Sequence, residues 1–316
     1  MKFLKSYSFK NNSIISIGNL SVGGSGKTPM VIALSKILDN LSVSHAVVSR
    51  GYKKKSFGEV VVSDGLNIVK DHRVSGDEPL LLASTLKGVP VVVGDKARAI
   101  NIVNKLKKYK TILIDDGYQT FKIKRDLKIL LLDLSKKITD YRLFPVGCLR
   151  EPLSSISRAD IVLFTKGDGP LSKKLKSYLM KYINLNTQLV LDTQMIYSLL
   201  EFKNNSFSKI GKIIERRVIS FSGIASPQPF IKISKKMFVN IVDNFTFSDH
   251  CIYNKRTISK IKSSIKKNNA RGIVTTMKDF IKIKPYFSGF SIFVVDVEYD
   301  IINVELLEKM LKKFKN

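Results

Sequence analysis

The stretch "SIISIGNLSVGGSGKTPMVIAL", residues 13–34, constrains the fold more than any other part of this chain. Its first six residues, "SIISIG", include three β-branched isoleucines, which indicates a buried strand. Apolar residues then recur at helical spacing from Met30 to Leu38, and Pro29 stands where a proline is tolerated in the first turn of a helix. A glycine-rich loop joins the two elements. We therefore predict a strand, a phosphate-binding loop and a helix, which is the arrangement of a P-loop.

The predicted loop comprises Ser21, Val22, Gly23, Gly24, Ser25, Gly26, Lys27 and Thr28. The glycines allow several backbone N–H groups to face one anion, and the helix N-terminus adds its positive end. Lys27 would reach the β- and γ-phosphates of ATP, and the Thr28 hydroxyl would hold Mg²⁺. The usual pattern opens with glycine where this chain has Ser21. The alternative is a glycine turn that happens to precede a helix.

Two acids follow a second apolar run in "TILIDDGYQ". Asp115 and Asp116 come directly after a β-branched segment, where a P-loop protein carries the carboxylate that holds Mg²⁺ or its water. The alternative interpretation is structural, because Asp-Asp-Gly is also a common turn.

Charged residues stand at the ends of several other predicted elements. In "SGDEPLLLA", Asp77 and Glu78 open an apolar helix, where acids are favourable for purely structural reasons. Other charged residues of this kind are Arg50 after a strand, Arg150 and Glu151 in the loop "LFPVGCLREP", and Asp249 and His250 in "FTFSDHC". A lone histidine is more often structural than catalytic.

Strands alternate with helices along most of the chain, so we expect an α/β fold with a doubly wound, mostly parallel sheet and a second, smaller α/β domain. The predicted boundaries are a P-loop kinase domain in residues 1–200, a hairpin-like linker in 201–216 and the smaller domain in 217–316. The linker is suggested by a turn-forming Asn-Asn pair between apolar runs. The last helix could pack back on the first domain.

The net charge of +28 predicts attraction to something anionic: nucleic acid, an acidic membrane surface or a phosphorylated substrate. A compositional bias toward lysine explains the same charge, because the lysines are scattered over many predicted helices. The two cysteines are too few for a disulfide scaffold and suit a reducing compartment. No run of 18 apolar residues is present, and the first residues lack the apolar core of a secretion signal.

In their order, the blocks "GNLSVGGSGKTP", "SRGY", "GDEPLLLA", "VVVGDKARA", "DDGYQ", "GCLREP", "SGIASPQPF", "FSDH" and "TMKDF" resemble the tetraacyldisaccharide 4′-kinases of lipid A biosynthesis. They extend from residue 18 to residue 280. The resemblance implies transfer of the ATP γ-phosphate to the 4′-hydroxyl of a tetraacyldisaccharide 1-phosphate lipid. It also implies two α/β domains with a cleft between them, and a peripheral position on the cytoplasmic face of the inner membrane, at an anionic surface. We expect a monomer.

Carried over to this sequence, the resemblance assigns the nucleotide and Mg²⁺ to Lys27 and Thr28. It assigns the metal and its waters to Asp115 and Asp116. Asp77 would be the general base, paired with His250. Glu78, Arg50, Arg150 and Glu151 would complete the cleft.

This chain departs from the family at three places. Cys251 and Thr120 stand where the family often has histidines, so a supporting proton relay or substrate contact could differ. The family usually has an apolar N-terminal helix, whereas mostly polar residues precede Ser13 here. Either the gene start is misplaced or the enzyme meets the membrane by other means.

Two other classes of function are compatible with a P-loop. A P-loop ATPase acting on nucleic acid would use the positive charge, but no stacking motif, second helicase-like block or arginine cluster is present, so we expect no nucleic-acid partner. A nucleotide-binding scaffold without chemistry would not need the acids and the histidine together.

Overall fold

The computed structural model describes residues 7–23, 26–51, 58–68, 72–106, 108–167 and 169–315. They divide into two compact units: unit 1 holds residues 1–195 and 298–316, and unit 2 holds residues 196–297. The predicted boundaries were 1–200, 201–216 and 217–316. The strands β8 (Leu189–Lys203) and β13 (Ser291–Ile301) each contribute residues to both units, and β13 returns the chain to unit 1.

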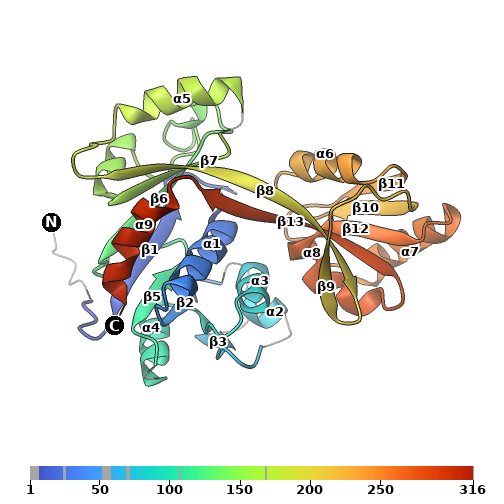
Figure 1. Cartoon of the computed structure of the whole chain (residues 1–316), viewed down its shortest axis with the longest axis horizontal. Helices are drawn as coiled ribbons and strands as arrows, with labels where there is room; N and C mark the ends of the chain where they lie inside the picture. Colours follow the sequence, from blue (N-terminus) through green and yellow to red (C-terminus); the bar gives the residue numbers. More distant parts are fainter. Residues whose placement is uncertain are drawn as a thin grey trace. The chain divides into compact units, whose positions relative to one another are not determined.

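Unit 1 contains a mostly parallel sheet with the strand order β8-β7-β6-β1-β5-β2-β4-β3 (Figure 1). Strand β3 runs antiparallel to its neighbour β4, and the pairs from β8–β7 to β2–β4 in this order are parallel. Besides β8, the strands are β1 (Ser13–Asn19), β2 (His45–Ser49), β3 (Val60–Ser63), β4 (Val91–Val93), β5 (Thr111–Ile114), β6 (Leu127–Asp133) and β7 (Ile161–Thr165). The α/β fold class is confirmed; β3 was not predicted.

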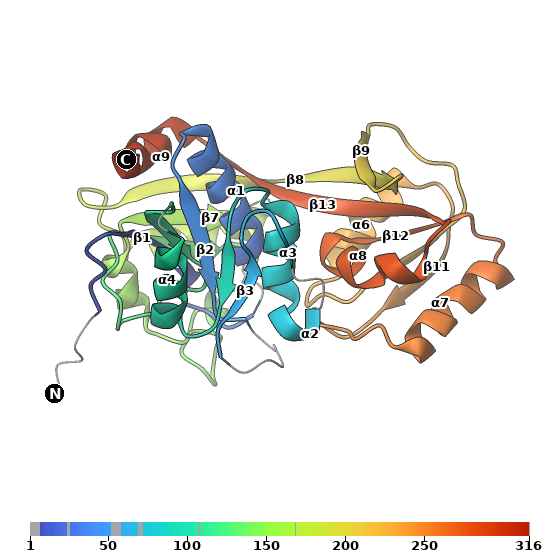
Figure 2. The ribbon, with the colours of Figure 1, turned by 90° about the horizontal axis from the view of Figure 1, so that it is seen from below.

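Helices cover both faces of this sheet because side chains alternate along each strand. They are α1 (Lys27–Asn40), α2 (His72–Ser75), α3 (Asp77–Thr85), α4 (Lys96–Lys105), α5 (Pro170–Met180) and α9 (Val304–Leu311). Ile15 and Ile17 of β1 pack in one core cluster with α1, α3 and α9, whereas Ile14 packs on the other face with α4. The last helix, α9, lies beside α1 (Figures 1 and 2).

Unit 2 is built on the same principle with fewer elements. The parallel strands β11 (Ile241–Thr246), β10 (Val218–Ser222), β12 (Gly272–Thr276) and β13 are neighbours in that order. The helix α6 (Gln228–Met237) covers one face, and α7 (Lys255–Lys267) and α8 (Met277–Ile283) cover the other.

The Asn-Asn pair, predicted as the turn of a hairpin-like linker, joins two paired strands whose turn lies within unit 2. Strand β9 (Ser206–Ile210) pairs antiparallel with β8, and both residues of the turn, Asn204 and Asn205, have positive φ angles of 51° and 59°. Asparagine tolerates this left-handed conformation, which matches the twist of a two-residue hairpin. Short 3₁₀ helices are η1 (Ile138–Asp140), η2 (Leu153–Arg158), η3 (Lys284–Tyr286) and η4 (Lys312–Phe314).

Candidate active site at the carboxyl edge of unit 1

The site lies where three neighbouring parallel strands end. Strand β1 is hydrogen-bonded to β5 on one side and to β6 on the other. The glycine loop follows β1, and the Asp115–Asp116 pair follows β5, so the sheet order places both segments at one edge. Just after β5, the Gly117 N–H donates to the carbonyl of Ile17 at 2.7 Å, which fixes the acidic turn against β1.

The loop after β1 bends through residues in the left-handed region. Gly23 and Gly26 have φ angles of 94° and 80°, and Gly26 directly precedes the first turn of α1. A Cβ atom on Gly26 would lie 2.2 Å from the Tyr299 hydroxyl, so a larger residue there would require Tyr299 to move. The predicted loop members Gly24 and Ser25 lie outside the described residues.

Ser21 replaces the first glycine of the usual pattern without strain. Ser21 pairs with Leu149 in an isolated antiparallel bridge, and the Ser21 side chain is buried. The Asn19 amide donates to the Ser21 carbonyl at 2.9 Å and to its hydroxyl at 3.2 Å. The next residue, Val22, is exposed, and its N–H donates to the carbonyl of Cys148 at 2.8 Å.

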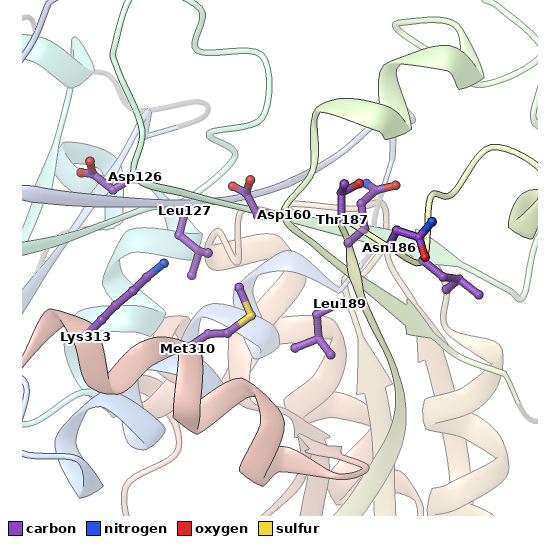
Figure 3. A pocket seen from close by; sticks show the side chains of 10 residues that line it. Asp126, Leu127, Asp160, Asn186, Thr187, Leu189, Met310 and Lys313 are labelled. Atoms are coloured by element: carbon purple, nitrogen blue, oxygen red, sulfur yellow. The ribbon is translucent and has the colours of Figure 1, made fainter.

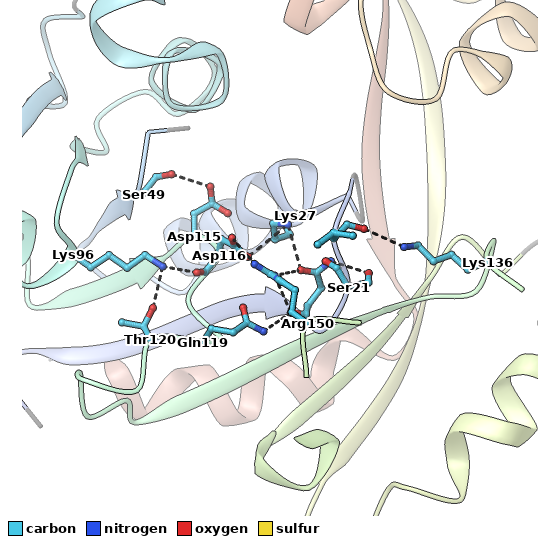
Figure 4. Close-up of polar contacts among 12 residues, drawn as sticks. Ser21, Lys27, Ser49, Lys96, Asp115, Asp116, Gln119, Thr120, Lys136 and Arg150 are labelled. Atoms are coloured by element: carbon cyan, nitrogen blue, oxygen red, sulfur yellow. Dashed lines mark hydrogen bonds and ion pairs between the residues drawn. The ribbon is translucent and has the colours of Figure 1, made fainter. Parts of the chain in front are cut away.

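Lys27 begins α1 and points toward the acidic turn (Figure 4). Its ammonium donates to the Asn19 side-chain oxygen at 3.3 Å and lies 3.6 Å from an Asp116 carboxylate oxygen. The neighbouring Thr28 is 8 % exposed. The predicted cation is therefore placed between β1 and the acids that follow β5.

The two acids occupy different environments. Asp115 is 3 % exposed; one carboxylate oxygen accepts from the Ser49 hydroxyl at 3.1 Å, and the other has no hydrogen-bond partner within the part of the chain that the structure describes. Burial raises the pKa of Asp115, against the attraction of Lys27. A buried carboxylate oxygen without a donor fits a cation or a water that a cation holds.

Asp116 is held in ion pairs. The Arg150 guanidinium donates to both of its oxygens at 3.1 and 3.4 Å, and Lys27 lies on the same carboxylate. Burial by itself would raise the pKa of Asp116, but Lys27 and Arg150 outweigh it, so the pKa is lowered and the carboxylate stays charged. Arg150 also donates to the Asn19 side-chain oxygen at 2.7 Å, which ties the loop, the acid and the "LREP" segment together.

Lys96, Asn19 and Gln119 complete this site and were not singled out from the sequence. The Lys96 ammonium donates to the Asp116 backbone carbonyl and, at 3.0 Å, to the Thr120 hydroxyl (Figure 4). Burial lowers the pKa of Lys96 to about 8, although Asp116 and Asp115 both oppose the shift. Gln119 donates to the Asn19 carbonyl at 2.9 Å. All three residues lie within the quoted sequence blocks, which were the available signal.

The other predicted residues of unit 1 are Glu151, Arg50, Asp77 and Glu78. Glu151 pairs with Arg158 at 2.5 Å instead of with the acidic turn, and Arg158 stacks over Tyr118 at 5.0 Å. Arg50 is exposed at the end of β2, close enough to Lys96 to lower the pKa of that ammonium. Asp77 and Glu78 are half-buried in the first turn of α3, which follows Gly76 with a φ of 88°.

Unit 2 places His250 in a turn with its own charged neighbours. His250 has a φ of 61°, and the Lys278 ammonium lies 3.4 Å from its ring and 3.0 Å from the Asp249 carboxylate. The buried Asp279 accepts from the Gly223 N–H at 2.9 Å, and Lys282 donates to the Cys251 carbonyl at 3.1 Å. These contacts hold the turn through residues of α8.

Two further properties of the chain concern clusters of metal-binding side chains and helices that could span a membrane. Among the described residues, no group of three or more histidine, cysteine or acidic side chains could hold a metal ion. In that same part of the chain, no helix combines the length and apolar character needed to span a bilayer.

A groove lies where β6, β7 and β8 begin (Figure 3). Its two acids, Asp126 and Asp160, accept from the backbone N–H groups of Ile14 and Lys128, each at 2.7 Å, near the starts of strands. The rest of the lining is apolar and polar in turn: Leu127, Leu185, Leu189 and Met310, together with Asn186, Thr187, Gln188 and Lys313. These carboxylates stabilise strand starts.

Known proteins resemble this chain over most of its length. The sequence profile of the family described as tetraacyldisaccharide-1-P 4′-kinase matches residues 1–315. A tetraacyldisaccharide 4′-kinase from Desulfotalea psychrophila is 35% identical over 280 residues, covering 86% of this chain and 79% of that protein. One from Geobacter metallireducens is 29% identical over 310 residues, covering 96% and 88%.

A solved structure gives the same result. The structure of LpxK from Aquifex aeolicus in complex with ATP superimposes with a TM-score of 0.79 at 32% identity, covering 99% of this chain and 91% of that one. With a glycine loop, a lysine and two acids converging at one sheet edge, and with relatives matching nearly the whole length, this chain belongs to the tetraacyldisaccharide-1-P 4′-kinase family.

Proposed function

We propose that this protein is an ATP-dependent kinase that transfers the γ-phosphate to the 4′-hydroxyl of a tetraacyldisaccharide 1-phosphate in lipid A biosynthesis. The observation that supports this most is the convergence of Lys27, Asp116, Arg150 and the buried Asp115 beside the loop after β1. Family membership over the whole chain supplies the substrate class. Family membership does not support the alternative function, a P-loop ATPase that acts on nucleic acid.

The proposed nucleotide contacts come from residues 21–28. The backbone N–H groups and Lys27 would hold the β- and γ-phosphates, and Thr28, Asp115 and Asp116 would hold Mg²⁺. Magnesium, when bound, neutralises charge on the phosphate oxygens. Arg150 and Lys96 keep the Asp116 turn in place, the first through its carboxylate and the second through its backbone carbonyl.

The proposed general base is Asp77, supported by His250. A sugar hydroxyl is a poor nucleophile while protonated, and a carboxylate within hydrogen-bond reach accelerates transfer by accepting its proton, typically about 10²- to 10⁴-fold. Glu78, Arg50 and Glu151 are proposed to bind substrate or to position these groups. The ion pair between Glu151 and Arg158 supports a positioning role for Glu151.

The proposed working place is the cytoplasmic face of the inner membrane, with the monomer as the active form. The high net positive charge favours an anionic lipid surface. The substrate class also favours it, since an acylated disaccharide resides in a bilayer.

The function is tested by incubating the purified protein with γ-labelled ATP, Mg²⁺ and tetraacyldisaccharide 1-phosphate dispersed in detergent. Thin-layer chromatography should show label transferred to the lipid. Matched reactions with single-stranded nucleic acid should show no stimulation of ADP release. Stimulation by nucleic acid without labelled lipid would reject the proposal.

A further inference from the structure

A compact loop beside the phosphate-binding segment exposes a cluster of apolar side chains. We call residues 142–146, "RLFPV", the apolar tip. Leu143, Phe144 and Val146 are 50 %, 70 % and 75 % exposed, and the neighbouring Val22 is 44 % exposed. Other large exposed apolar residues of unit 1, such as Leu66 and Leu185, are far from this segment in sequence and need no joint explanation.

Hydrogen bonds connect the two sides of this loop. The backbone N–H groups of Phe144, Gly147 and Leu149 donate to carbonyls of the same loop at 2.9 to 3.0 Å. The buried Tyr141 donates its hydroxyl to the Asp133 carbonyl at 2.9 Å. A Cβ atom on Gly147 would lie 2.4 Å from the Arg142 carbonyl, so the tight turn requires glycine. The apolar side chains are therefore presented by a fixed backbone.

The same loop is hydrogen-bonded to the phosphate-binding segment. Val22 donates to the Cys148 carbonyl at 2.8 Å, and Arg150 donates its backbone N–H to the Leu20 carbonyl at 2.7 Å. The apolar tip thus lies a few residues from the segment that precedes Lys27. A surface that contacts lipid here would hold the site at the level of a lipid headgroup.

Charged residues around the tip favour an anionic surface. Within residues 136–146, Lys136, Lys137 and Arg142 are cationic and Asp140 is acidic. The Asp140 carboxylate accepts from the Lys137 N–H at 2.8 Å. Lys136 donates to the Val22 carbonyl at 3.3 Å, which places its charge beside the tip. Apolar side chains flanked by lysine and arginine are typical of segments that bind the headgroup region of anionic membranes.

We propose that the apolar tip inserts into the surface of an anionic bilayer and positions the phosphate-binding site at the headgroup level. This inference rests on the proposed lipid kinase activity. A protein partner is a poorer occupant, because a specific interface buries roughly 800 Å² on each side and a tip of four apolar side chains is much smaller.

The first test measures binding of the full chain to vesicles of phosphatidylethanolamine and phosphatidylglycerol by flotation, without substrate lipid. The variant Leu143→Ser/Phe144→Ser/Val146→Ser should bind roughly 10- to 100-fold more weakly, because the apolar transfer is lost. The matched control Leu66→Ser/Leu185→Ser/Ile302→Ser removes three exposed apolar side chains elsewhere and should bind like wild type. Equal binding of both variants would overturn the proposal.

The second test reports insertion directly and does not depend on a destabilising variant. Val146→Cys, in a background with Cys148→Ser and Cys251→Ser, is labelled with an environment-sensitive fluorophore. Anionic vesicles should shift its emission to the blue, and lipids carrying a quencher in the acyl chain should quench it; a label at Leu66→Cys should show neither effect. A shift that requires the substrate lipid would assign the tip to the acyl chains of the substrate and reject the bilayer.

The inference and the proposed function can fail separately. If wild-type protein phosphorylates the lipid but the tip variant binds vesicles normally, only the inference is wrong. If no lipid is phosphorylated although the tip inserts, the proposed function is wrong. With substrate dispersed in detergent, the tip variant should retain wild-type kcat.

Discussion

At the scale of single residues, Lys27 is the most direct test of the phosphate site. Its ammonium lies between the side chains of Asn19 and Asp116. From there it would neutralise charge on a transferring phosphoryl group. We expect Lys27→Ala to lower kcat by on the order of 10²-fold or more with an unchanged melting temperature. Lys36→Ala, on the exposed part of the same helix, is the control and should keep full activity. Wild-type turnover in a folded Lys27→Ala protein would refute the P-loop assignment.

His45 is a structural histidine whose titration affects stability. Its Nδ1 faces the Val43 carbonyl at 2.9 Å, which can only accept, so Nδ1 carries the proton and Nε2 accepts from the Ser35 hydroxyl at 2.6 Å. Burial lowers the pKa of His45 below its ordinary 6.5, although the Val43 carbonyl and Asp39 raise it. Between the lowered pKa and 6.5, the unfolded chain binds a proton that the folded chain does not.

The free energy of unfolding should therefore fall as the pH decreases below 6.5, by at most about 1.4 kcal/mol per pH unit from this group. His45→Gln removes the titrating ring, so its melting temperature should be lower at pH 8 but depend less on pH below 6.5. The measurement is thermal unfolding of both proteins from pH 8 to pH 5. Parallel curves would show that His45 does not cause the dependence.

At the scale of elements, the start of α1 depends on Gly26. Its φ of 80° costs a residue with a side chain about 1–2 kcal/mol, and its Cβ would also collide with Tyr299. Gly26→Ala should lower the melting temperature by several degrees and lower kcat at least about 10-fold, since the helix N-terminus must shift. The control is Gly23→Ala. Gly23 has a similar φ of 94°, but its Cβ position is open, so this variant should be milder than Gly26→Ala.

The collision gives this prediction a rescue experiment. Tyr299→Ala removes the side chain that the new Cβ of Gly26→Ala would strike. The double variant should therefore be more stable than the sum of the two single effects predicts. Gly23→Ala combined with Tyr299→Ala should be additive. If Gly26→Ala and Gly23→Ala are equally mild, the close approach of Tyr299 does not constrain the loop.

At the scale of the whole molecule, the proposed base involves residues of both units. If Asp77 and His250 act together on one proton, their losses should not add. Asp77→Ala should lower kcat strongly and His250→Ala less, with little change in KM for ATP, and the double variant should be hardly worse than Asp77→Ala alone. Asp77→Ala combined with Lys36→Ala is the additive control.

The structural alternative makes a different prediction. In it Asp77 stabilises the start of α3, and Lys278 and Asp249 hold His250 as part of the turn. Both single variants would then lower the melting temperature with unchanged kcat. Measuring kcat and melting temperature on all three variants separates the two.

Local patterns were sufficient for a glycine turn between β1 and α1, for the acidic turn after β5 and for the Asn-Asn turn between β8 and β9. In each of these, neighbours in sequence supply the physical cause: glycines that allow positive φ, a strand that ends in acids, and two asparagines that tolerate the left-handed region. The alternation of apolar segments likewise predicted a parallel α/β sheet, because both faces of such strands are buried.

Contacts between distant segments were not readable from those patterns. Arg150 pairs with Asp116, while the adjacent Glu151 pairs with Arg158. Lys96 reaches the carbonyl of Asp116 from the start of α4. Strand β13 returns residues 298–316 to unit 1, where α9 covers the core beside α1. These outcomes depend on strand order and on which side chains share a buried space, and both are properties of the folded chain rather than of any short stretch of it.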